Sequence, residues 1–248
     1  MKLSLITVSY NSELTIRDTL ESVKNQSNRD LEYIVIDGGS TDGTIEILKD
    51  YSNIIDKIVS EPDKGIYDAM NKGIEIATGD IVGILNSDDT FYSNTVINEV
   101  ISFHKKNKIQ ASIGNISQYT KSGKLIRLYC SNSWVVKDLK FGFMPAHPSI
   151  FFEKELFNIF GNYSLDYKIA ADYELIVRFF LKQKIIWKYS NIHTTKMLIG
   201  GASSNGIVSY INITREIIKA LNDNGVRFFK ATIVFRFISK LNQVLFRE

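Results

Sequence analysis

Four polar residues with the chemistry to bind a metal ion follow an apolar run in the first half of the chain. The cluster Asn86-Ser87-Asp88-Asp89 comes directly after Ile81–Leu85. An uninterrupted apolar run is typical of a strand covered on both faces, and parallel sheets bind ligands at the carboxyl ends of their strands. Two adjacent carboxylates at such an edge are suitable ligands for Mg²⁺ or Mn²⁺. The same residues could also form a surface turn that opens a helix, because Ser and Asp cap helices.

Two further polar segments end predicted strands. Leu3–Val8 is followed by Ser9-Tyr10-Asn11-Ser12, and Leu31–Ile36 is followed by the glycine-rich segment Asp37–Thr44. Glycine allows positive φ angles and close approach of the backbone to a ligand. We therefore expect all three polar segments at one edge of a sheet.

The elements that must position these segments alternate between strands and helices in the first half of the chain. Strands are expected at 3–8, 31–36, 54–60 and from 81, with helices around 16–23 and at 45–51, 66–77 and 94–106. This alternation predicts a parallel sheet with crossover helices. The second half is expected to contain a hairpin (111–119 and 125–129), helices at 154–160, 171–182, 207–221 and 226–246, and strands at 185–189 and 195–199.

Composition excludes several classes of protein. The chain has 248 residues, 44% hydrophobic and 23% charged, which is typical of a globular protein. The net charge of +3 is too small to indicate a nucleic-acid partner, although residues 215–248 alone carry +4. The single cysteine, Cys130, excludes an internal disulfide and fits a reducing compartment. No signal peptide or transmembrane run is recognised, so we expect a cytoplasmic protein.

Motifs of other nucleotide-binding or hydrolytic enzymes are missing from the sequence. The first strand is not followed by Gly-x-Gly-x-x-Gly, and the chain has no Gly-x-x-x-x-Gly-Lys-Ser/Thr segment. A dinucleotide oxidoreductase and a P-loop enzyme therefore lose their main support. The nucleophile elbow Gly-x-Ser-x-Gly of many hydrolases is also missing.

Four motifs, taken in order, resemble the family 2 glycosyltransferases of the GT-A fold. They are Thr7-Val8-Ser9-Tyr10-Asn11, then Asp37–Thr44, then Asp63-Lys64-Gly65 with Asp68–Gly73, and finally Asn86–Asp89. The resemblance is dense over residues 3–95 and thinner as far as Ile199–Ser204. It implies a single α/β domain with the GT-A fold: a mostly parallel central sheet flanked by helices, a small antiparallel element and C-terminal helices. Residues 1–95 would bind the nucleotide sugar, 96–222 the acceptor, and 223–248 would form a basic amphipathic helix.

The resemblance also implies a UDP-sugar donor. Tyr10 would pack against the uracil, the Thr7 backbone would bond its edge, and Asp37 would bind the uracil or ribose. The predicted donor-binding set is Thr7, Ser9, Tyr10, Asn11, Asp37, Asp63, Lys64, Asn71, Asn86 and Ser87. Simpler roles stay open: Tyr10 packing on the sheet, Asp37 in a plain turn, and a solvated Lys64.

In the family's Asp-x-Asp motif the last acid corresponds to Asp88, whereas the first is Asn86 here. Mg²⁺ or Mn²⁺ would then bind Asp88, with Asp89 second, together with the two phosphates and water. Its role would be to neutralise the departing UDP. Asn86 is uncharged where the family has an acid. The activity could therefore depend less on the metal here than in the family.

A general base must take the proton from the attacking hydroxyl, and Asp172 matches the family's acid in Ile169–Leu175. The alternative is that Asp172 simply starts a helix, where the macrodipole favours an acid; Asp166 and Glu174 are the fallback candidates for the base. A base opposite the leaving diphosphate implies inversion of the anomeric configuration. His147, in Pro145–Ser149, is a candidate for a contact with the acceptor or a phosphate. Residues 200–204 are candidates for a loop that closes over the donor diphosphate.

The expected activity is that of the short bacterial O-antigen, capsule and exopolysaccharide glycosyltransferases. A hexose or N-acetylhexosamine would pass from a UDP-sugar to a polyprenyl-diphosphate-linked glycan. The basic residues of 226–246 suggest contact with an anionic membrane surface, which would make the enzyme peripheral at the inner face of the cell membrane. Two alternatives stay open: a transferase that uses GDP- or dTDP-sugars, and a catalytically inactive subunit that binds sugar nucleotides.

Overall fold

The computed structural model describes residues 1–27, 30–199 and 206–233. These residues fall into two compact units that alternate along the chain. Unit 1 comprises Met1–Asn132, Pro145–Asn162 and Ile186–Ile199; unit 2 comprises Ser133–Met144, Tyr163–Ile185 and the described part of Gly200–Glu248. The expected division into a donor half and an acceptor half concerns function and stays a prediction.

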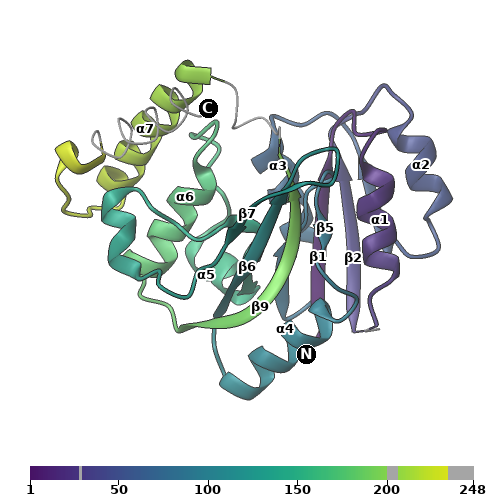
Figure 1. Ribbon diagram of the computed structural model, residues 1–248, viewed down its shortest axis with the longest axis horizontal. Helices are drawn as coiled ribbons and strands as arrows, with labels where there is room; N and C mark the ends of the chain where they lie inside the picture. Colours follow the sequence, from purple (N-terminus) through teal and green to yellow (C-terminus); the bar gives the residue numbers. More distant parts are fainter. Residues whose placement is uncertain (28–29, 200–205, 234–248) are drawn as a thin grey trace. The chain divides into compact units, whose positions relative to one another are not determined.

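The first strands of unit 1 form a parallel sheet with the order β3-β2-β1-β4; Figure 1 labels β1 and β2 of this sheet. Their bounds are β1 (Leu3–Ser9), β2 (Leu31–Asp37), β3 (Lys57–Ser60) and β4 (Ile81–Ile84). The register pairs Ser9 with Asp37 and Asp37 with Ser60, so the carboxyl ends of β1, β2 and β3 lie next to one another. This confirms the expected parallel arrangement and brings the polar segments after β1 and β2 to one edge.

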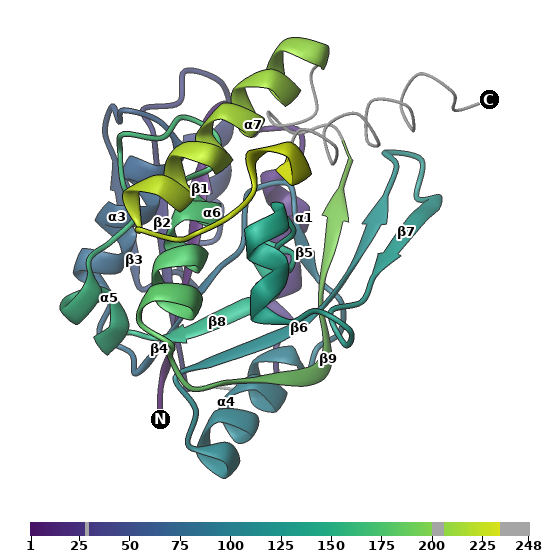
Figure 2. The same cartoon turned by 90° about the vertical axis from the view of Figure 1, so that its left-hand side faces the viewer.

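The rest of the sheet is mixed. Strand β8 (Ile150–Glu153) pairs antiparallel with β4 and with β6 (Ala111–Tyr119). Strand β9 (Trp187–Leu198) runs parallel to β6, while β7 (Leu125–Tyr129) and the short β5 (Thr90–Phe91) pair antiparallel with β6 and β9 (Figure 2). The hairpin β6–β7 has the predicted bounds. The prediction of separate strands at 185–189 and 195–199 was wrong, because one strand with register shifts spans most of both.

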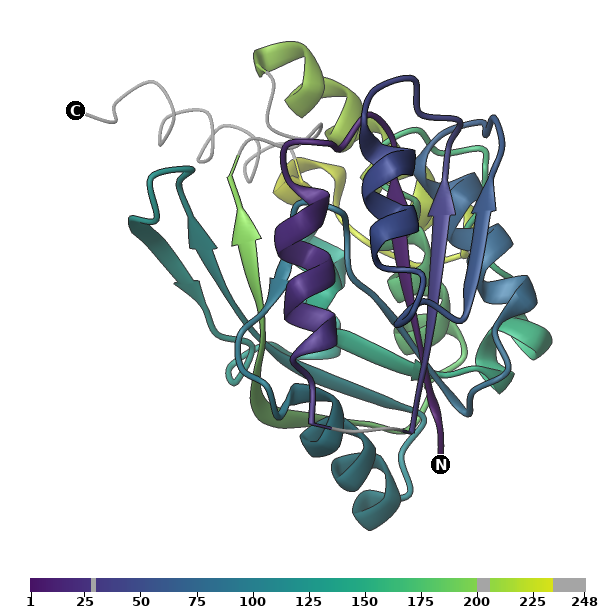
Figure 3. The same ribbon diagram turned by 90° about the vertical axis from the view of Figure 1, so that its right-hand side faces the viewer.

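Helices cover both faces of this sheet. The apolar sides of α1 (Ile16–Lys24), α2 (Thr44–Asp50) and α4 (Val96–Asn107) pack in one cluster with buried residues of β1 and β2 (Figure 3). Helix α3 (Ile66–Ile76) packs with Ile6: a Cβ added at Gly73 would lie 2.5 Å from Ile6 Cγ2. Glycine at this position therefore allows the close approach of α3 to β1.

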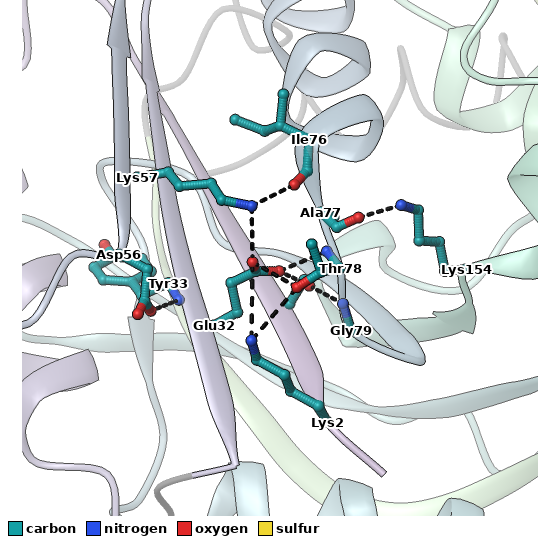
Figure 4. A network of polar contacts seen from close by, with 11 residues as sticks. Lys2, Glu32, Tyr33, Asp56, Lys57, Ile76, Ala77, Thr78, Gly79 and Lys154 are labelled. Carbon is teal, nitrogen blue, oxygen red and sulfur yellow. Dashed lines mark hydrogen bonds and ion pairs between the residues drawn. The ribbon is translucent and has the colours of Figure 1, made fainter.

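Glu32 joins the opposite, amino-terminal ends of the strands (Figure 4). Its carboxylate is only 3% exposed and accepts hydrogen bonds from Ser4 Oγ, from the Thr78 backbone N–H (2.7 Å) and hydroxyl (2.8 Å), and from Lys57 Nζ (2.9 Å). Burial raises the pKa of Glu32, but the hydrogen bonds from these residues lower it more, to about 2. One buried carboxylate on β2 thus connects β1, β3 and the turn before β4.

Unit 2 is largely helical. It contains the 3-10 helix η1 (Val136–Phe141), α6 (Ala171–Ile176) continued by the π-helix η3 (Val177–Lys182), and α7 (Gly206–Asp223). The predicted helix at 171–182 is present, although its second half has π rather than α geometry. The helix predicted at 207–221 is confirmed as α7. Most of the helix predicted at 226–246, like the predicted loop at 200–204, lies outside the described residues.

Candidate functional site

The segment after β4 is a tightly held turn. Asn86 Nδ2 donates to Asp89 Oδ2 (3.2 Å), and the Asp89 backbone N–H donates to the Asn86 carbonyl (3.0 Å). The Thr19 hydroxyl of α1 donates to the Asp89 carbonyl (2.8 Å). Asp89 is fully buried, whereas Asp88 is half-buried. The turn therefore holds Asp89, with Asp88 next to it in the chain, at the carboxyl end of β4.

The electrostatics of this turn are unfavourable for two anions. Burial raises the pKa of Asp88. Burial and the neighbouring Asp88 charge raise the pKa of Asp89 well above its usual value, despite the hydrogen bond from Asn86. Among the described residues, Asn86 Oδ1 and Asp89 Oδ1 are buried without a hydrogen-bond partner. Buried polar atoms normally have partners, so within the described residues these two oxygens lack a donor or a cation.

These residues fit a divalent cation. Carboxylate and amide oxygens are the hard ligands that Mg²⁺ and Mn²⁺ take, and the two acids would gain the charge partner that they lack. Within the described ranges there is no cluster of three or more His, Cys, Asp or Glu side chains that could hold a metal ion. The remaining ligands would therefore have to be substrate phosphates and water, the usual arrangement for Mg²⁺.

Polar contacts connect the turn after β4 with the segments after β1 and β2. The Ser12 and Ser87 hydroxyls lie 2.8 Å apart. Asn11, at φ 48°, donates its backbone N–H to Ser40 Oγ (2.8 Å), and its Oδ1 accepts the Thr41 N–H (2.9 Å). A positive φ is tolerated by Asn better than by most residues, and here it turns the side chain toward the second segment. The three predicted polar segments therefore form one continuous edge.

Asp37 orders this edge from within. It is fully buried and accepts five hydrogen bonds: from the hydroxyls of Ser9, Ser40 and Ser60 and from the backbone N–H groups of Gly39 and Ser40. These contacts define the turn after β2 and engage both carboxylate oxygens. Binding of uracil or ribose by Asp37, and of the donor by Ser9, stays a prediction; the observed contacts show that both residues shape the loop.

Tyr10 and Asp63 flank Gly38. A Cβ added at Gly38 would lie 2.4 Å from Asp63 Oδ2 and 3.4 Å from Tyr10 Cδ2. The Tyr10 side chain is 63% exposed, which leaves its ring accessible for stacking. Thr7, in contrast, is buried, and its hydroxyl accepts a hydrogen bond from the Tyr33 hydroxyl (3.1 Å). A donor contact of Thr7 would therefore involve its backbone, as predicted, and this contact is untested.

The third motif surrounds the start of α3. Asp63 Oδ1 accepts the Gly65 N–H (2.7 Å), and Asp68 Oδ2 accepts the Lys64 N–H (3.0 Å). The Lys64 side chain is exposed, and Asn71 is half-buried on α3. Through Gly38 the structure brings Asp63 to the polar edge, while the donor-binding roles of Lys64 and Asn71 stay predictions.

His147 lies in the short helix η2 (His147–Ser149) before β8. Burial lowers its pKa to about 4, so the ring is neutral near pH 7. A neutral ring offers a hydrogen bond rather than a charge to a phosphate. The acceptor or phosphate contact of His147 stays a prediction. If it forms, it would be made by the neutral ring.

Asp172 belongs to unit 2. It lies in the first turn of α6, is half-buried, and its Oδ1 accepts the Tyr173 N–H (2.8 Å). Of the fallback candidates, Asp166 is exposed, whereas Glu174 is 6% exposed and binds Arg178 through two hydrogen bonds of 3.0 Å. Because the carboxylate of Glu174 is already paired with Arg178, Asp172 remains the better candidate for a base.

Ser12 and Thr19 were not among the predicted site residues. Thr19 is fully buried between Ile16 and Leu20 of α1. A polar residue on the apolar side of an amphipathic helix was the signal in the sequence, because such a hydroxyl needs a partner when it is buried. Ser12 had no comparable signal.

Comparisons with known proteins point to one family. The sequence profile described as "Glycosyl transferase family 2" matches residues 4–170. A PGL/p-HBAD biosynthesis glycosyltransferase of Mycobacterium bovis is 27% identical over 222 residues, which cover 88% of this chain and 83% of that protein.

Two solved structures share the fold. S. aureus TarS (residues 1–349) in complex with UDP-GlcNAc has a TM-score of 0.72 at 19% identity and covers 98% of this chain and 73% of that one; this chain matches 44% of a longer TarS structure. The mannosyltransferase PcManGT of Pyrobaculum calidifontis, with GDP-Man and Mn²⁺, has a TM-score of 0.66 at 16% identity, covering 90% of this chain and 63% of that one. The chain belongs to glycosyl transferase family 2 and is a glycosyltransferase with the GT-A fold.

Proposed function

We propose that this glycosyltransferase moves a hexose or N-acetylhexosamine from a UDP-sugar to a polyprenyl-diphosphate-linked glycan, with inversion, in the synthesis of a bacterial surface polysaccharide. The observation that carries the donor side is the turn after β4. Asp88 and Asp89 have raised pKa values, and Asn86 Oδ1 and Asp89 Oδ1 are buried without a hydrogen-bond partner among the described residues. A metal-bound diphosphate would satisfy this turn.

The nucleobase of the donor would bind at Tyr10. Its exposed ring offers a stacking surface next to Gly38 and Asp63, and stacking on an aromatic ring tolerates any base. UDP-GlcNAc in the TarS structure favours a UDP-sugar. GDP-Man in PcManGT keeps a GDP-sugar as the second candidate donor, and a dTDP-sugar remains a further alternative.

A divalent cation, when bound, would supply positive charge to the departing diphosphate. Asp88 and Asp89 would hold it, and the Asn86 amide oxygen would contribute without charge. Mn²⁺ in PcManGT supports this assignment. Ser12 and Thr19 would keep the turn in place, through Ser87 Oγ and the Asp89 carbonyl.

Asp172 would accept the proton of the attacking acceptor hydroxyl. Its position in the first turn of α6 favours the carboxylate form, and the hydrogen bond from the Tyr173 N–H fixes its orientation. A base on the side of the acceptor allows displacement from the face opposite the leaving group, which inverts the anomeric carbon. Residues 1–95 would serve the donor and 96–222 the acceptor, with His147 as an uncharged contact.

The acceptor is proposed to be lipid-linked because residues 215–248 carry a charge of +4. Basic residues attract a protein to an anionic membrane surface, so we place the enzyme in the cytoplasm, at the inner face of the cell membrane. No helix within the described ranges is long and apolar enough to cross a membrane.

Release of the nucleoside diphosphate from a panel of UDP-, GDP- and dTDP-sugars, with and without Mn²⁺, tests the proposal. Turnover of a UDP-sugar that rises with Mn²⁺ is expected, and preferential turnover of a GDP- or dTDP-sugar would reassign the donor. Binding of UDP without turnover of any donor would favour the alternative of an inactive, sugar-nucleotide-binding subunit.

A further inference from the structure

We propose that Glu216 of α7 is a positioning residue that holds the main chain carrying Asp172. The inference rests on the proposed role of Asp172 as the general base. Glu216 lies beyond residues 4–170, the part of the chain that the family profile matches. It follows Asp172 by more than forty residues in the sequence, so the connection is visible only in the fold.

The carboxylate of Glu216 binds three consecutive backbone N–H groups. Glu216 Oε1 accepts the Lys168 N–H (2.9 Å), and Oε2 accepts those of Ile169 (2.9 Å) and Ala170 (2.8 Å). Successive N–H groups that converge in this way form an anion-binding concavity. Hydrogen bonds to a charged acceptor are roughly twice as strong as those between neutral groups. This concavity is filled by the protein's own carboxylate.

The bound segment leads directly into Asp172. Ala170 is the N-cap residue of α6, its carbonyl accepts the Glu174 N–H (3.0 Å), and Asp172 lies between them. The side chain of Asp172 in turn accepts the Tyr173 N–H. A displacement of residues 168–170 would therefore move the Asp172 carboxylate together with the first turn of the helix.

Helix α7 lies beside α6 within unit 2 (Figure 2), and further side-chain contacts hold it there. Asn224 Nδ2, just after α7, donates to Glu174 Oε1 (3.1 Å). The Tyr167 hydroxyl donates to Asp223 Oδ2 (2.7 Å), and Lys219 Nζ lies 4.0 Å from the centroid of the Tyr167 ring. Glu216 therefore projects from a helix that is itself attached on either side of residues 168–170.

The charge of Glu216 is committed to the main chain. Within the described part of the chain, no Lys, Arg or His side chain forms an ion pair with Glu216. A carboxylate used as a surface ion pair would have a cationic partner, whereas within the described residues the donors to Glu216 are backbone N–H groups. The arrangement is suited to ordering a loop, since removing the acceptor would leave three N–H groups without their partner.

Three variants test the inference in the full-length protein: Glu216→Ala, Glu216→Gln and the control Arg215→Ala. Arg215 is the preceding residue on α7 and is exposed. Turnover is measured as release of the nucleoside diphosphate, with water as the acceptor, from whichever donor of the sugar-nucleotide panel the wild type uses fastest. The temperature is chosen so that every variant is folded, and UDP affinity and amide hydrogen exchange of residues 163–176 are measured in parallel.

Glu216→Ala is expected to lower turnover about 10- to 100-fold, the usual effect of misplacing a catalytic group, with UDP affinity unchanged. The exchange of residues 168–170 should accelerate. Glu216→Gln, which keeps an acceptor oxygen, should recover part of the turnover, and Arg215→Ala should resemble the wild type. A purely structural role would change the exchange and the melting temperature but not the turnover of the folded variant.

The variant Asp172→Asn distinguishes a failure of the base assignment from a failure of the positioning role. Wild-type turnover in Asp172→Asn would refute the base assignment and with it the present inference. Loss of turnover in Asp172→Asn combined with wild-type turnover in Glu216→Ala would refute the positioning role alone. Weakened UDP binding in Glu216→Ala would also refute it, because the effect would then not be confined to residues 168–176.

Discussion

Replacing Glu32 by Gln should destabilise unit 1 strongly at neutral pH and progressively less as the pH falls below 5. The folded-state pKa of Glu32 is about 2, against 4.5 for an unperturbed Glu. At 1.36 kcal/mol for each pKa unit, the ionised carboxylate contributes about 3 kcal/mol to the free energy of unfolding. Because the folded pKa is lowered, this contribution is complete above the unfolded pKa of 4.5 and is lost as the pH falls toward 2.

The assay is denaturant unfolding of wild type and Glu32→Gln at a series of pH values from 7 down to 3. The difference in unfolding free energy should be about 3 kcal/mol at pH 7 and shrink steadily below pH 5. Glu75→Gln, which changes an exposed glutamate on α3, is the matched control and should shift stability by less than about 0.5 kcal/mol. A difference that is below about 1 kcal/mol at pH 7, or that does not change with pH, would refute the reasoning.

Three further predictions concern the candidate site. Tyr10→Ala should weaken UDP binding roughly 10- to 100-fold, as expected for loss of about 1–3 kcal/mol of base stacking, while Tyr10→Phe should bind normally in calorimetry; equal effects of both would exclude stacking. Asn86→Asp adds a third carboxylate to the turn after β4 and should tighten Mn²⁺ binding in the presence of UDP, measured by calorimetry; unchanged affinity would place Asn86 outside the metal's ligands. Asp172→Asn should reduce sugar transfer by about 10²- to 10⁴-fold, the range for loss of a general base, without changing UDP affinity; weaker UDP binding would assign Asp172 to structure instead.

The polar edge could be predicted because it depends on local rules. Parallel strands end at the same edge of a sheet, so the residues after Val8, Ile36 and Leu85 had to come together once the strands were recognised. The hairpin β6–β7 followed from two strand-like runs around Lys121-Ser122-Gly123, where Gly123 has φ +78°. These patterns require only near neighbours in the sequence.

Other features depend on distant contacts. Strand β8 is only four residues long, and β5 only two, too short for a periodic pattern. Strand β9 continues through Asn191, at φ 58°, because its pairing with β6 tolerates register shifts. The π-helix η3 has the same apolar spacing over a few residues as an α-helix, so periodicity could not distinguish them.

Among the site residues too, some features could be predicted from the sequence and others could not. Asp37 was recognised as important by its position, but its five hydrogen bonds within the loop could not be read from the sequence. Glu216 binds residues 168–170 from another helix, and no local pattern marks such a contact. Strand ends therefore locate the site, while the residues that hold its parts in place require the fold.

The most direct test of the account is Mn²⁺-dependent UDP release by wild type, Asp88→Asn and the control Asp18→Asn, which changes an exposed acid on α1. The account predicts that the wild type turns over a UDP-sugar with Mn²⁺ and loses most of this turnover in EDTA. Asp88→Asn should be slower by about a hundredfold or more, as expected when a metal ion loses a charged ligand that stabilises the leaving group, and Asp18→Asn should match the wild type. Undiminished turnover in Asp88→Asn, or turnover of no sugar nucleotide at all by the wild type, would contradict it.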